Sequence, residues 1–336
     1  MLHYSIKYLT EDIAMNRLFS QFRLIVFFLG VTSTSILAAA TVEIADFGSN
    51  PGNLRMFRYL PSTLQPSTPL VIALHGCKQT ASDYGDQTGW IQFADRWGFV
   101  LLLPQQQQTN NHWSCFNWFR PGDSSRDQGE ALSIQQMIDR MKADYPIDPD
   151  RIYITGLSAG GAMAAVMLAT YPEVFASGAI IAGIPYRCAS GLWSALRCML
   201  WGRDLNPLAW GNRVRPVGGG TTLNGKPWPT VSIWQGDDDF IVRWVNAREL
   251  VEQWTDVHGI DRQPDGEDTV NGYPHQVYKD AAGHVRVELY LITRMGHGVP
   301  IDPGATEDHC GTPGDYILAV GICSSYYIAK FWGLDQ

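Results

Sequence analysis

The sequence of 336 residues predicts an α/β fold in which helices cover both faces of a mostly parallel central sheet. Two continuous apolar runs, residues 69–76 and 99–104, predict strands that are buried on both faces, as in a parallel sheet. Between the next strands, apolar residues recur at helical spacing over 129–144 and predict a helix. Strands and helices then keep alternating along the chain, which is typical of a parallel sheet covered on two sides.

The remaining elements follow in chain order. Strands are predicted at 151–155, 178–183, 230–234 and 285–293, and helices at 158–170, 246–258 and 326–332. The stretch 200–229 is rich in Gly, Pro and Trp and is interpreted as a long loop or cap, whereas the polar stretch around His275 and His284 is interpreted as a hairpin. Because no internal repeat or linker interrupts this order, residues 41–336 are expected to form one mature domain.

Composition narrows the class of protein. Hydrophobic residues make up 45% and charged residues 17%, so a wholly disordered chain is excluded. The formal net charge of -8 argues against a nucleic-acid partner, which needs a basic surface. The 12 Trp, 14 Tyr and 13 Phe exceed what a core usually needs, and part of them is expected to line a binding groove.

Residues 1–40 have the features of a signal peptide. Arg17 and Arg23 precede an apolar run at 24–40 that ends in small residues, the pattern cut by signal peptidase. A membrane anchor is the alternative, but Thr and Ser interrupt the run and no charged flank follows it. Met15 is an alternative start. The mature protein is therefore expected to be secreted or periplasmic, without a membrane span.

Six cysteines in an exported chain suggest disulfides, although six allow fifteen pairings. Pairing of neighbours would join Cys77 to Cys115, Cys188 to Cys198 and Cys310 to Cys323, and buried free thiols are the alternative. No spacing matches a zinc site, so no metal is expected.

The segment Gly156-Leu157-Ser158-Ala159-Gly160 carries the strongest chemical signal. It lies between a predicted strand and a predicted helix, the context in which G-x-S-x-G forms a nucleophile elbow. The helix N-terminus would supply backbone N–H groups for a developing oxyanion, that of Ala159 among them. A glycine-rich turn with an incidental serine is the alternative interpretation.

A serine nucleophile needs a base and an orienting acid. Among the histidines after Ser158, His297 follows the last predicted strand directly and is the preferred base; His258 is expected to end a helix. Asp237, Asp238 and Asp239 follow a strand together, and spacing leaves the choice among them open. A solvated turn is the alternative for these residues, because the distal Glu of a calcium loop is missing.

Two further segments complete the expected site. The N–H of Cys77 follows a strand that ends in His75-Gly76 and is the candidate second oxyanion donor, with His75 interpreted as structural. Trp118, with Phe119, is the candidate apolar wall beside the scissile bond, and ordinary core packing is the alternative.

Taken together, these motifs resemble the polyhydroxybutyrate depolymerase family of esterases, whose relatives include feruloyl and acetylxylan esterases. The resemblance covers roughly residues 55–334. It rests on His75-Gly76-Cys77, Gln79, Trp90, Ala94-Asp95, Pro104-Gln105, Cys115-Phe116-Asn117-Trp118-Phe119, Gly156-Leu157-Ser158-Ala159-Gly160-Gly161 and Phe331-Trp332-Gly333-Leu334.

The resemblance implies an α/β-hydrolase fold and a cofactor-independent serine esterase. It assigns the triad to Ser158, His297 and Asp239, an oxyanion donor to Cys77, and a disulfide to Cys77 and Cys115. The implied substrates are poly- or oligo(3-hydroxyalkanoate) esters. Feruloyl or acetyl esters of plant polysaccharide, or an inactive polymer-binding hydrolase fold, are the alternatives. Many secreted members carry a separate polymer-binding domain; none is expected here, so tight binding to solid granules is not expected.

Overall fold

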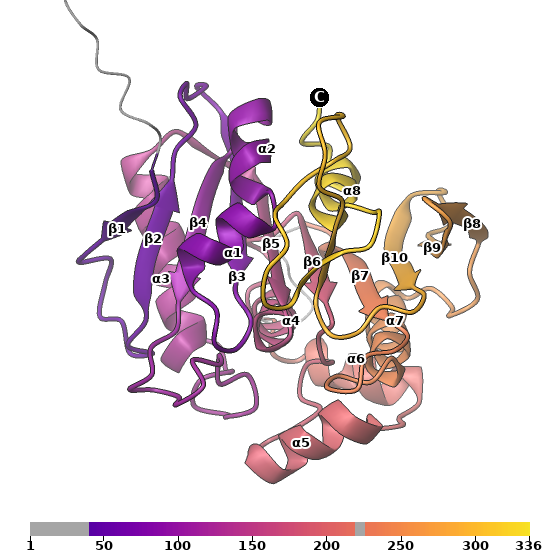
Figure 1. Cartoon of the computed structure of the whole chain (residues 1–336). Coiled ribbons are helices and arrows are strands. Elements are labelled where there is room, and N and C mark those ends of the chain that lie inside the picture. The colour runs from indigo at the N-terminus through magenta and orange to yellow at the C-terminus, as the bar shows by residue number, and fades with distance from the viewer. Residues whose placement is uncertain (1–39, 219–225) are drawn as a thin grey trace, which may run out of the picture. The chain divides into compact units, whose positions relative to one another are not determined.

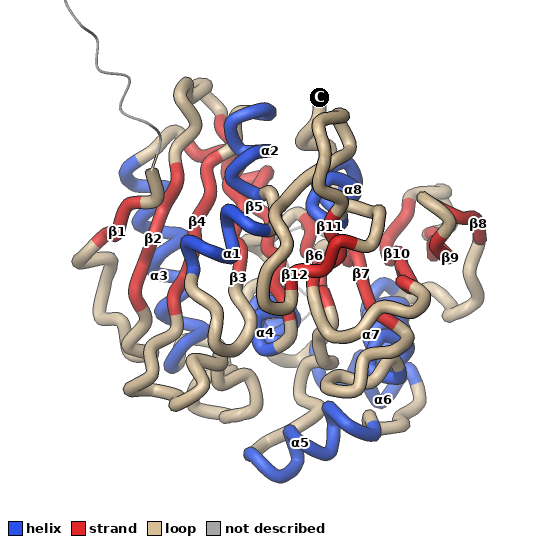
Figure 2. Tube along the Cα trace, viewed as in Figure 1, coloured by secondary structure: helices blue, strands red, loops and turns tan. Residues whose placement is uncertain are grey.

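A ten-stranded sheet lies at the centre of the computed structural model, which describes residues 40–218 and 226–336 (Figure 1). Its order is β1-β2-β4-β3-β5-β6-β7-β10-β9-β8. The six inner strands are parallel: β4 (Val100–Gln105), β3 (Thr68–Leu74), β5 (Ile147–Leu157), β6 (Ser177–Ile181), β7 (Thr230–Gly236) and β10 (Val285–Ile292). Antiparallel strands flank them: β1 (Val42–Ile44), β2 (Arg55–Tyr59), β9 (Tyr273–Lys279) and β8 (Gly266–Val270). A separate short parallel pair joins β11 (Val299–Ile301) to β12 (Ile317–Ala319) (Figure 2).

Helices pack on both faces of this sheet. Side chains of β3 alternate between the two cores: Leu70 and Ile72 belong to one, and Val71 and Ala73 to the other. The first core includes residues of α3 (Gly129–Asp144), α4 (Ala159–Thr170), α5 (Leu192–Trp201), α6 (Pro207–Val214) and α7 (Val245–His258). The second includes residues of α1 (Ala81–Gln87), α2 (Trp90–Trp97) and α8 (Ser324–Phe331). Burial on two faces explains the continuous apolar runs in the sequence.

The predicted α/β class and each predicted strand and helix are present, and α3 matches 129–144. The predicted loop at 200–229 is wrong in part, because it contains the end of α5 and all of α6. Asn206 caps α6 through its side chain, which accepts a hydrogen bond from the Ala209 N–H, and Pro207 occupies the first turn. Trp210 and Val214 are then buried. Residues 219–225 of this predicted loop lie outside the described residues.

The predicted hairpin around His275 is β8 and β9, joined by Asn271 and Gly272. Both turn residues have positive φ, 49° and 83°, the conformation in which Asn-Gly closes a two-residue hairpin. His284 lies in the following turn between β9 and β10.

The expected signal peptide, apart from Ala40, lies outside the described residues. Within residues 40–218 and 226–336, no helix combines the length and the hydrophobicity needed to cross a bilayer.

Candidate active site

Ser158 occupies a strained turn between β5 and α4. Its backbone has φ 57° and ψ -115°, in the left-handed half of conformational space, and its N–H donates to the Ile181 carbonyl at 2.9 Å. A Cβ atom on Gly156 would lie 2.5 Å from the Gly160 backbone, and one on Gly160 would overlap the carbonyl oxygen of Leu74. Both glycines are therefore required by the close approach of the backbone, as in a nucleophile elbow.

His297 follows β10 and bonds to a buried carboxylate that follows β7. Its Nδ1 donates to Asp239 Oδ2 at 2.7 Å. The other oxygen, Oδ1, accepts the N–H groups of Ile241 and Val242, each at 2.8 Å, and Gln235 Nε2 donates to Oδ2 at 3.0 Å. These four donors hold the carboxylate at one orientation. A proton on Nδ1 leaves Nε2 of His297 as the ring atom that can accept one.

The two aspartates that precede Asp239 contact the loop after β10. Asp237 and Asp238 are exposed, whereas Asp239 is buried. Asp237 Oδ1 accepts the Arg294 N–H at 2.5 Å, and the Asp238 N–H donates to the Met295 carbonyl at 3.1 Å. These contacts hold together the loops after β7 and β10. The choice that spacing left open is therefore resolved geometrically: of the three, Asp239 carries the carboxylate that bonds His297.

Sheet topology brings the serine to the same edge as this pair. Ser158 follows β5, Asp239 follows β7 and His297 follows β10, and these strands run parallel within the order β5-β6-β7-β10. Ligands of open parallel sheets bind at this carboxyl edge. Among the described residues, no hydrogen bond joins Ser158 to His297; contacts of this kind often tighten only when substrate binds.

A cavity of about 690 Å³ opens beside Ser158. The expected wall residues Trp118 and Phe119 line it and are also packed in the core, so both interpretations of them apply. Trp113 lines it as well. Sequence reasoning missed the apolar lining contributed by Ile184 and by α5, namely Leu192, Ala195, Leu196 and Met199.

Two backbone amides at this cavity are free to bind an oxyanion. Ala159 is the first residue of α4, so its N–H has no acceptor within the helix. The N–H of Cys77 makes no hydrogen bond among the described residues. Both residues line the cavity together with Ser158, so their N–H groups are the candidates for binding an oxyanion there.

His75 fixes the segment that carries Cys77. The ring is fully buried; Nδ1 donates to the Gly76 carbonyl at 2.7 Å, and Nε2 accepts the Gln106 N–H at 3.1 Å. Burial lowers the pKa of His75 to about 4, so the ring is neutral at pH 7. Its role is the structural one expected from the sequence.

This buried histidine predicts acid sensitivity. Between about pH 6.5 and 4 the unfolded chain binds a proton at His75 that the folded protein does not bind. Neutral His75 therefore contributes about 3 kcal/mol to the free energy of unfolding. This contribution is complete above pH 6.5 and is lost as the pH falls from 6.5 to 4. His75→Asn should therefore flatten the slope of unfolding free energy against pH in this window by about one proton, measured by urea denaturation at several pH values. An unchanged slope would contradict a neutral, buried His75.

Glu130, in the first turn of α3, is a supporting residue that sequence reasoning missed. It is fully buried and accepts hydrogen bonds from Asn117 N–H at 2.8 Å, Asn117 Nδ2 at 2.7 Å and Gln106 Nε2 at 2.5 Å. Burial raises the pKa of Glu130 to about 8. These bonds tie the loop that carries Trp118 to α3. A Glu in the first turn of a helix is usually interpreted as an exposed residue that interacts with the helix dipole. The sequence therefore gives no signal that Glu130 is buried and binds the Trp118 loop.

All six cysteines are paired, in the arrangement of neighbours. Cys77–Cys115 joins the segment of the free amide to the loop of Trp118, with 4.3 Å between Cα atoms. The other bonds are Cys188–Cys198 and Cys310–Cys323.

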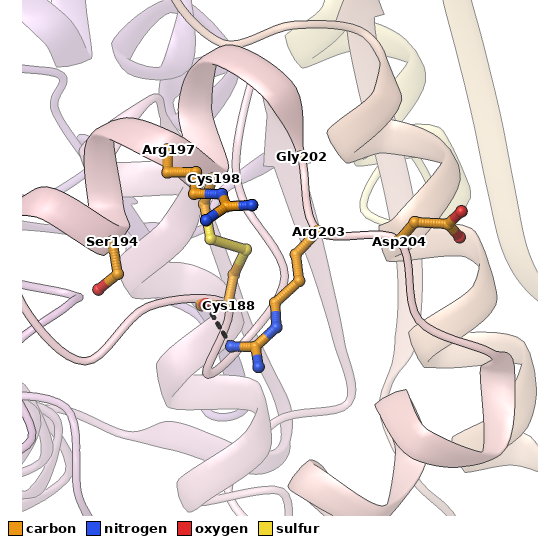
Figure 3. A pocket seen from close by; sticks show the side chains of 7 residues that line it. All are labelled: Cys188, Ser194, Arg197, Cys198, Gly202, Arg203 and Asp204. Atoms are coloured by element: carbon orange, nitrogen blue, oxygen red, sulfur yellow. Dashed lines mark hydrogen bonds between the residues drawn. A yellow bond between two sulfur atoms is a disulfide. The ribbon is translucent and has the colours of Figure 1, made fainter.

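A second cavity, of about 460 Å³, is lined in part by the bonded residues Cys188 and Cys198 (Figure 3). Arg197, Arg203 and Asp204 line it, and it shares no lining residue with the Ser158 cavity. Within the described ranges, no group of three or more His, Cys, Asp or Glu side chains is placed to hold a metal ion.

Comparison with known proteins gives consistent similarities. A family model described as "Esterase PHB depolymerase" matches residues 55–266. Poly(3-hydroxyalkanoate) depolymerase C of Paucimonas lemoignei is 53% identical over 306 residues, which cover 91% of this chain and 72% of the relative. Feruloyl esterase B of Neurospora crassa is 34% identical over 280 residues, covering 81% and 92%. The solved structure of acetyl xylan esterase from Aspergillus awamori superposes with a TM-score of 0.73 at 22% identity, covering 88% of this chain and 100% of that one. This last likeness shows the α/β-hydrolase fold.

Proposed function

Because this chain belongs to the PHB depolymerase family of esterases and is a carboxylic ester hydrolase, we propose that Ser158, His297 and Asp239 are its catalytic triad. The family resemblance seen in the sequence is thereby confirmed. The observation that carries the triad proposal is the His297–Asp239 hydrogen bond of 2.7 Å at the sheet edge where the strained Ser158 turn lies.

The proposed mechanism follows from these positions. Ser158 Oγ attacks the ester carbonyl while His297 Nε2 takes its proton and then delivers it to the leaving alcohol. Asp239 keeps the Nδ1 proton in place and stabilises the imidazolium. The N–H groups of Ala159 and Cys77 bind the oxyanion. Water then attacks the acyl-enzyme while His297 Nε2 takes its proton; the proton passes to Ser158 Oγ as the bond to the acyl group breaks and the carboxylic acid leaves. No cofactor takes part in these steps.

For the substrate we propose poly- or oligo(3-hydroxyalkanoate) esters. The depolymerase relative is 53% identical over most of both chains, and the cavity beside Ser158 is walled by apolar side chains such as Trp118, Phe119 and Leu196. An aliphatic ester without charge or ring suits such a wall. Feruloyl or acetyl esters of polysaccharide remain the second candidate, because Asn110, Asn111 and His112 also line the cavity and offer polar groups to a sugar.

A panel of soluble esters tests the substrate. Trimers of 3-hydroxybutyrate, methyl ferulate and acetylated xylo-oligosaccharides should be compared by kcat/KM, with Ser158→Ala as the blank. We expect the hydroxybutyrate trimer to exceed the other two by at least about tenfold, ~1.4 kcal/mol in transition-state binding. A reversed order would support the polysaccharide esterase, and no turnover of any ester would support the inactive binding fold.

We also propose that residues 41–336 act outside the cytoplasm as a single domain after removal of residues 1–40. Three disulfides support this location, since such bonds persist in oxidising compartments. N-terminal sequencing of the active protein should begin near Thr41; an active, unprocessed cytoplasmic form would contradict the proposal.

The Cys77–Cys115 bond should matter more for catalysis than for folding. Its loss frees the segment whose Cys77 N–H is proposed to bind the oxyanion, and complete loss of one such donor lowers kcat by about 10²- to 10³-fold. Cys115→Ala is therefore expected to lower kcat by about 10- to 100-fold with the fold retained, measured by ester turnover and thermal unfolding.

Cys323→Ala is the matched control, because Cys310–Cys323 contributes no residue to the Ser158 cavity. It should mainly lower the melting temperature, as loss of a disulfide costs about 2–4 kcal/mol of stability. Equal effects of the two variants on kcat would contradict the proposed positioning role, as would full activity of Cys115→Ala.

A further inference from the structure

Helix α5 turns its apolar side chains outward. Five of its ten residues are large hydrophobics with exposed fractions of 38% or more: Leu192 59%, Trp193 83%, Leu196 39%, Leu200 38% and Trp201 71%. Only Ala195 and Cys198 are buried. A surface helix normally does the reverse, and a large exposed apolar patch on a folded domain usually marks a binding surface.

This helix is held firmly on its inner side. Cys198 is bonded to Cys188 (Figure 3), and the Met199 carbonyl accepts the Arg243 N–H at 2.9 Å and Asn246 Nδ2 at 3.2 Å. Figure 1 shows α5 apart from the sheet, on the side toward which β7 points. The apolar side chains are therefore presented on a fixed backbone at the carboxyl end of the strands.

A second segment extends the same surface. The loop after Asp239 exposes Phe240 at 71%, Ile241 at 39% and Trp244 at 46%. The bond from the Arg243 N–H to the Met199 carbonyl places this loop against α5. We use the term apolar rim for the eight exposed side chains of these two segments: Leu192, Trp193, Leu196, Leu200, Trp201, Phe240, Ile241 and Trp244.

The apolar rim is continuous with the active-site cavity. Leu192 and Leu196 belong to the rim and also line the cavity beside Ser158, and Trp113, 56% exposed, lines the same cavity. Leu192 and Leu196 therefore connect the rim to the apolar part of the cavity lining. Whatever adheres to the rim is placed next to the nucleophile.

We propose that the apolar rim adsorbs the enzyme to the surface of a solid aliphatic polyester, so that a surface chain enters the Ser158 cavity; this rests on the proposed function. The repeat of such a polyester has methyl and methylene groups, no charge and no hydrogen-bond donor, which suits a surface of Trp, Leu, Ile and Phe. On this proposal the catalytic domain has a binding surface of its own, whereas the sequence alone gives no reason to expect tight binding to solid granules.

A lipid bilayer is the competing partner for an exposed Trp- and Leu-rich helix. The formal net charge of -8 disfavours the anionic membrane surfaces that usually strengthen such binding. Continuity between the rim and the cavity favours a partner that is also the substrate. Polyester is therefore the occupant that both observations support.

Adsorption isotherms test the proposal directly. The triple variant Trp193→Ser, Leu200→Ser, Trp201→Ser removes rim side chains that do not line the cavity. It should be made in the Ser158→Ala protein so that the polymer is not eroded. Val42→Ser, which removes an exposed aliphatic side chain from the edge strand β1, is the control. On amorphous poly(3-hydroxybutyrate) particles, the adsorption constant of the triple variant should fall at least about tenfold, and that of the control should not change.

The same triple variant with Ser158 intact should hydrolyse a soluble hydroxybutyrate trimer within about twofold of the wild-type rate and solid polymer at least about tenfold more slowly. Unchanged adsorption, or equal losses on soluble and solid substrate, would overturn the proposal. So would wild-type binding to phosphatidylcholine vesicles in place of polyester, or dimerisation through the rim in sedimentation. If the wild type fails to turn over soluble esters while the isotherms still differ, the proposed function is wrong and the adsorption surface stands.

Discussion

Replacing Ser158 by Ala is expected to lower kcat for ester hydrolysis by about 10⁴- to 10⁶-fold. The reason is that the proposed acyl-enzyme forms on this hydroxyl, and only the oxyanion amides and substrate binding remain without it. Stability should change little, because the Ser158 backbone is already held at φ 57° by its neighbours and Ala has no larger side chain. The measurement is single-turnover hydrolysis of a chromogenic ester, with thermal unfolding as the control for the fold.

Residual activity above about one part in a thousand, in a preparation free of wild-type enzyme, would contradict the assignment of the nucleophile. A large fall in melting temperature would instead make the loss of activity a folding effect. The two outcomes are separated by comparing the unfolding midpoint with the rate.

Asp239→Asn is expected to lower kcat by about 10⁴-fold through the wrong tautomer of His297. Asp239 Oδ1 accepts two backbone N–H groups, from Ile241 and Val242, so the amide oxygen of Asn must take that position. Its NH₂ group then faces His297 Nδ1 in place of Oδ2. A donor there favours the ring with its proton on Nε2, which cannot accept the proton of Ser158.

Asp238→Asn is the control for this substitution, because Asp238 is exposed and it is the next residue, Asp239, that bonds His297. Its kcat should stay within about twofold of wild type. If Asp238→Asn proves to be the severe variant, the acid has been assigned one residue too late in the chain. Steady-state kinetics of both variants at pH 7 decide the matter.

Much of the fold can be predicted from the sequence because the inner strands are buried on both faces. β3 and β4 are continuous apolar runs, and α3 and α7 carry helical periodicity, so local pattern suffices for them. α6 is not predicted, because its surroundings are rich in Gly, Pro and Trp and suggest a loop. Asn206-Pro207 is the capping signal that indicates a helix start there. The edge strand β1 and its neighbour β2 are short and partly exposed, which leaves little pattern to detect.

The residues of the candidate site also differ in whether local sequence is enough to predict them. Ser158 is marked by its glycines, because the backbone approach that they permit is a local requirement. The choice of Asp239 among three identical neighbours depends on which side chain the tertiary fold buries, and only the family resemblance indicated it beforehand. The role of Glu130 and the outward face of α5 depend on what covers each element. A Leu- and Trp-rich helix is ordinarily buried, so its sequence does not reveal that its apolar face points to solvent.

Labelling with a fluorophosphonate tests whether Ser158 is the nucleophile, because this probe reacts with an activated serine hydroxyl. Intact-mass spectrometry and peptide mapping should find one label per chain, on Ser158, in proportion to the loss of ester turnover. Ser158→Ala should take up no label, and Asp239→Asn should react far more slowly. Label on another residue, or full ester turnover after Ser158 is completely labelled, would show that Ser158 is not the nucleophile.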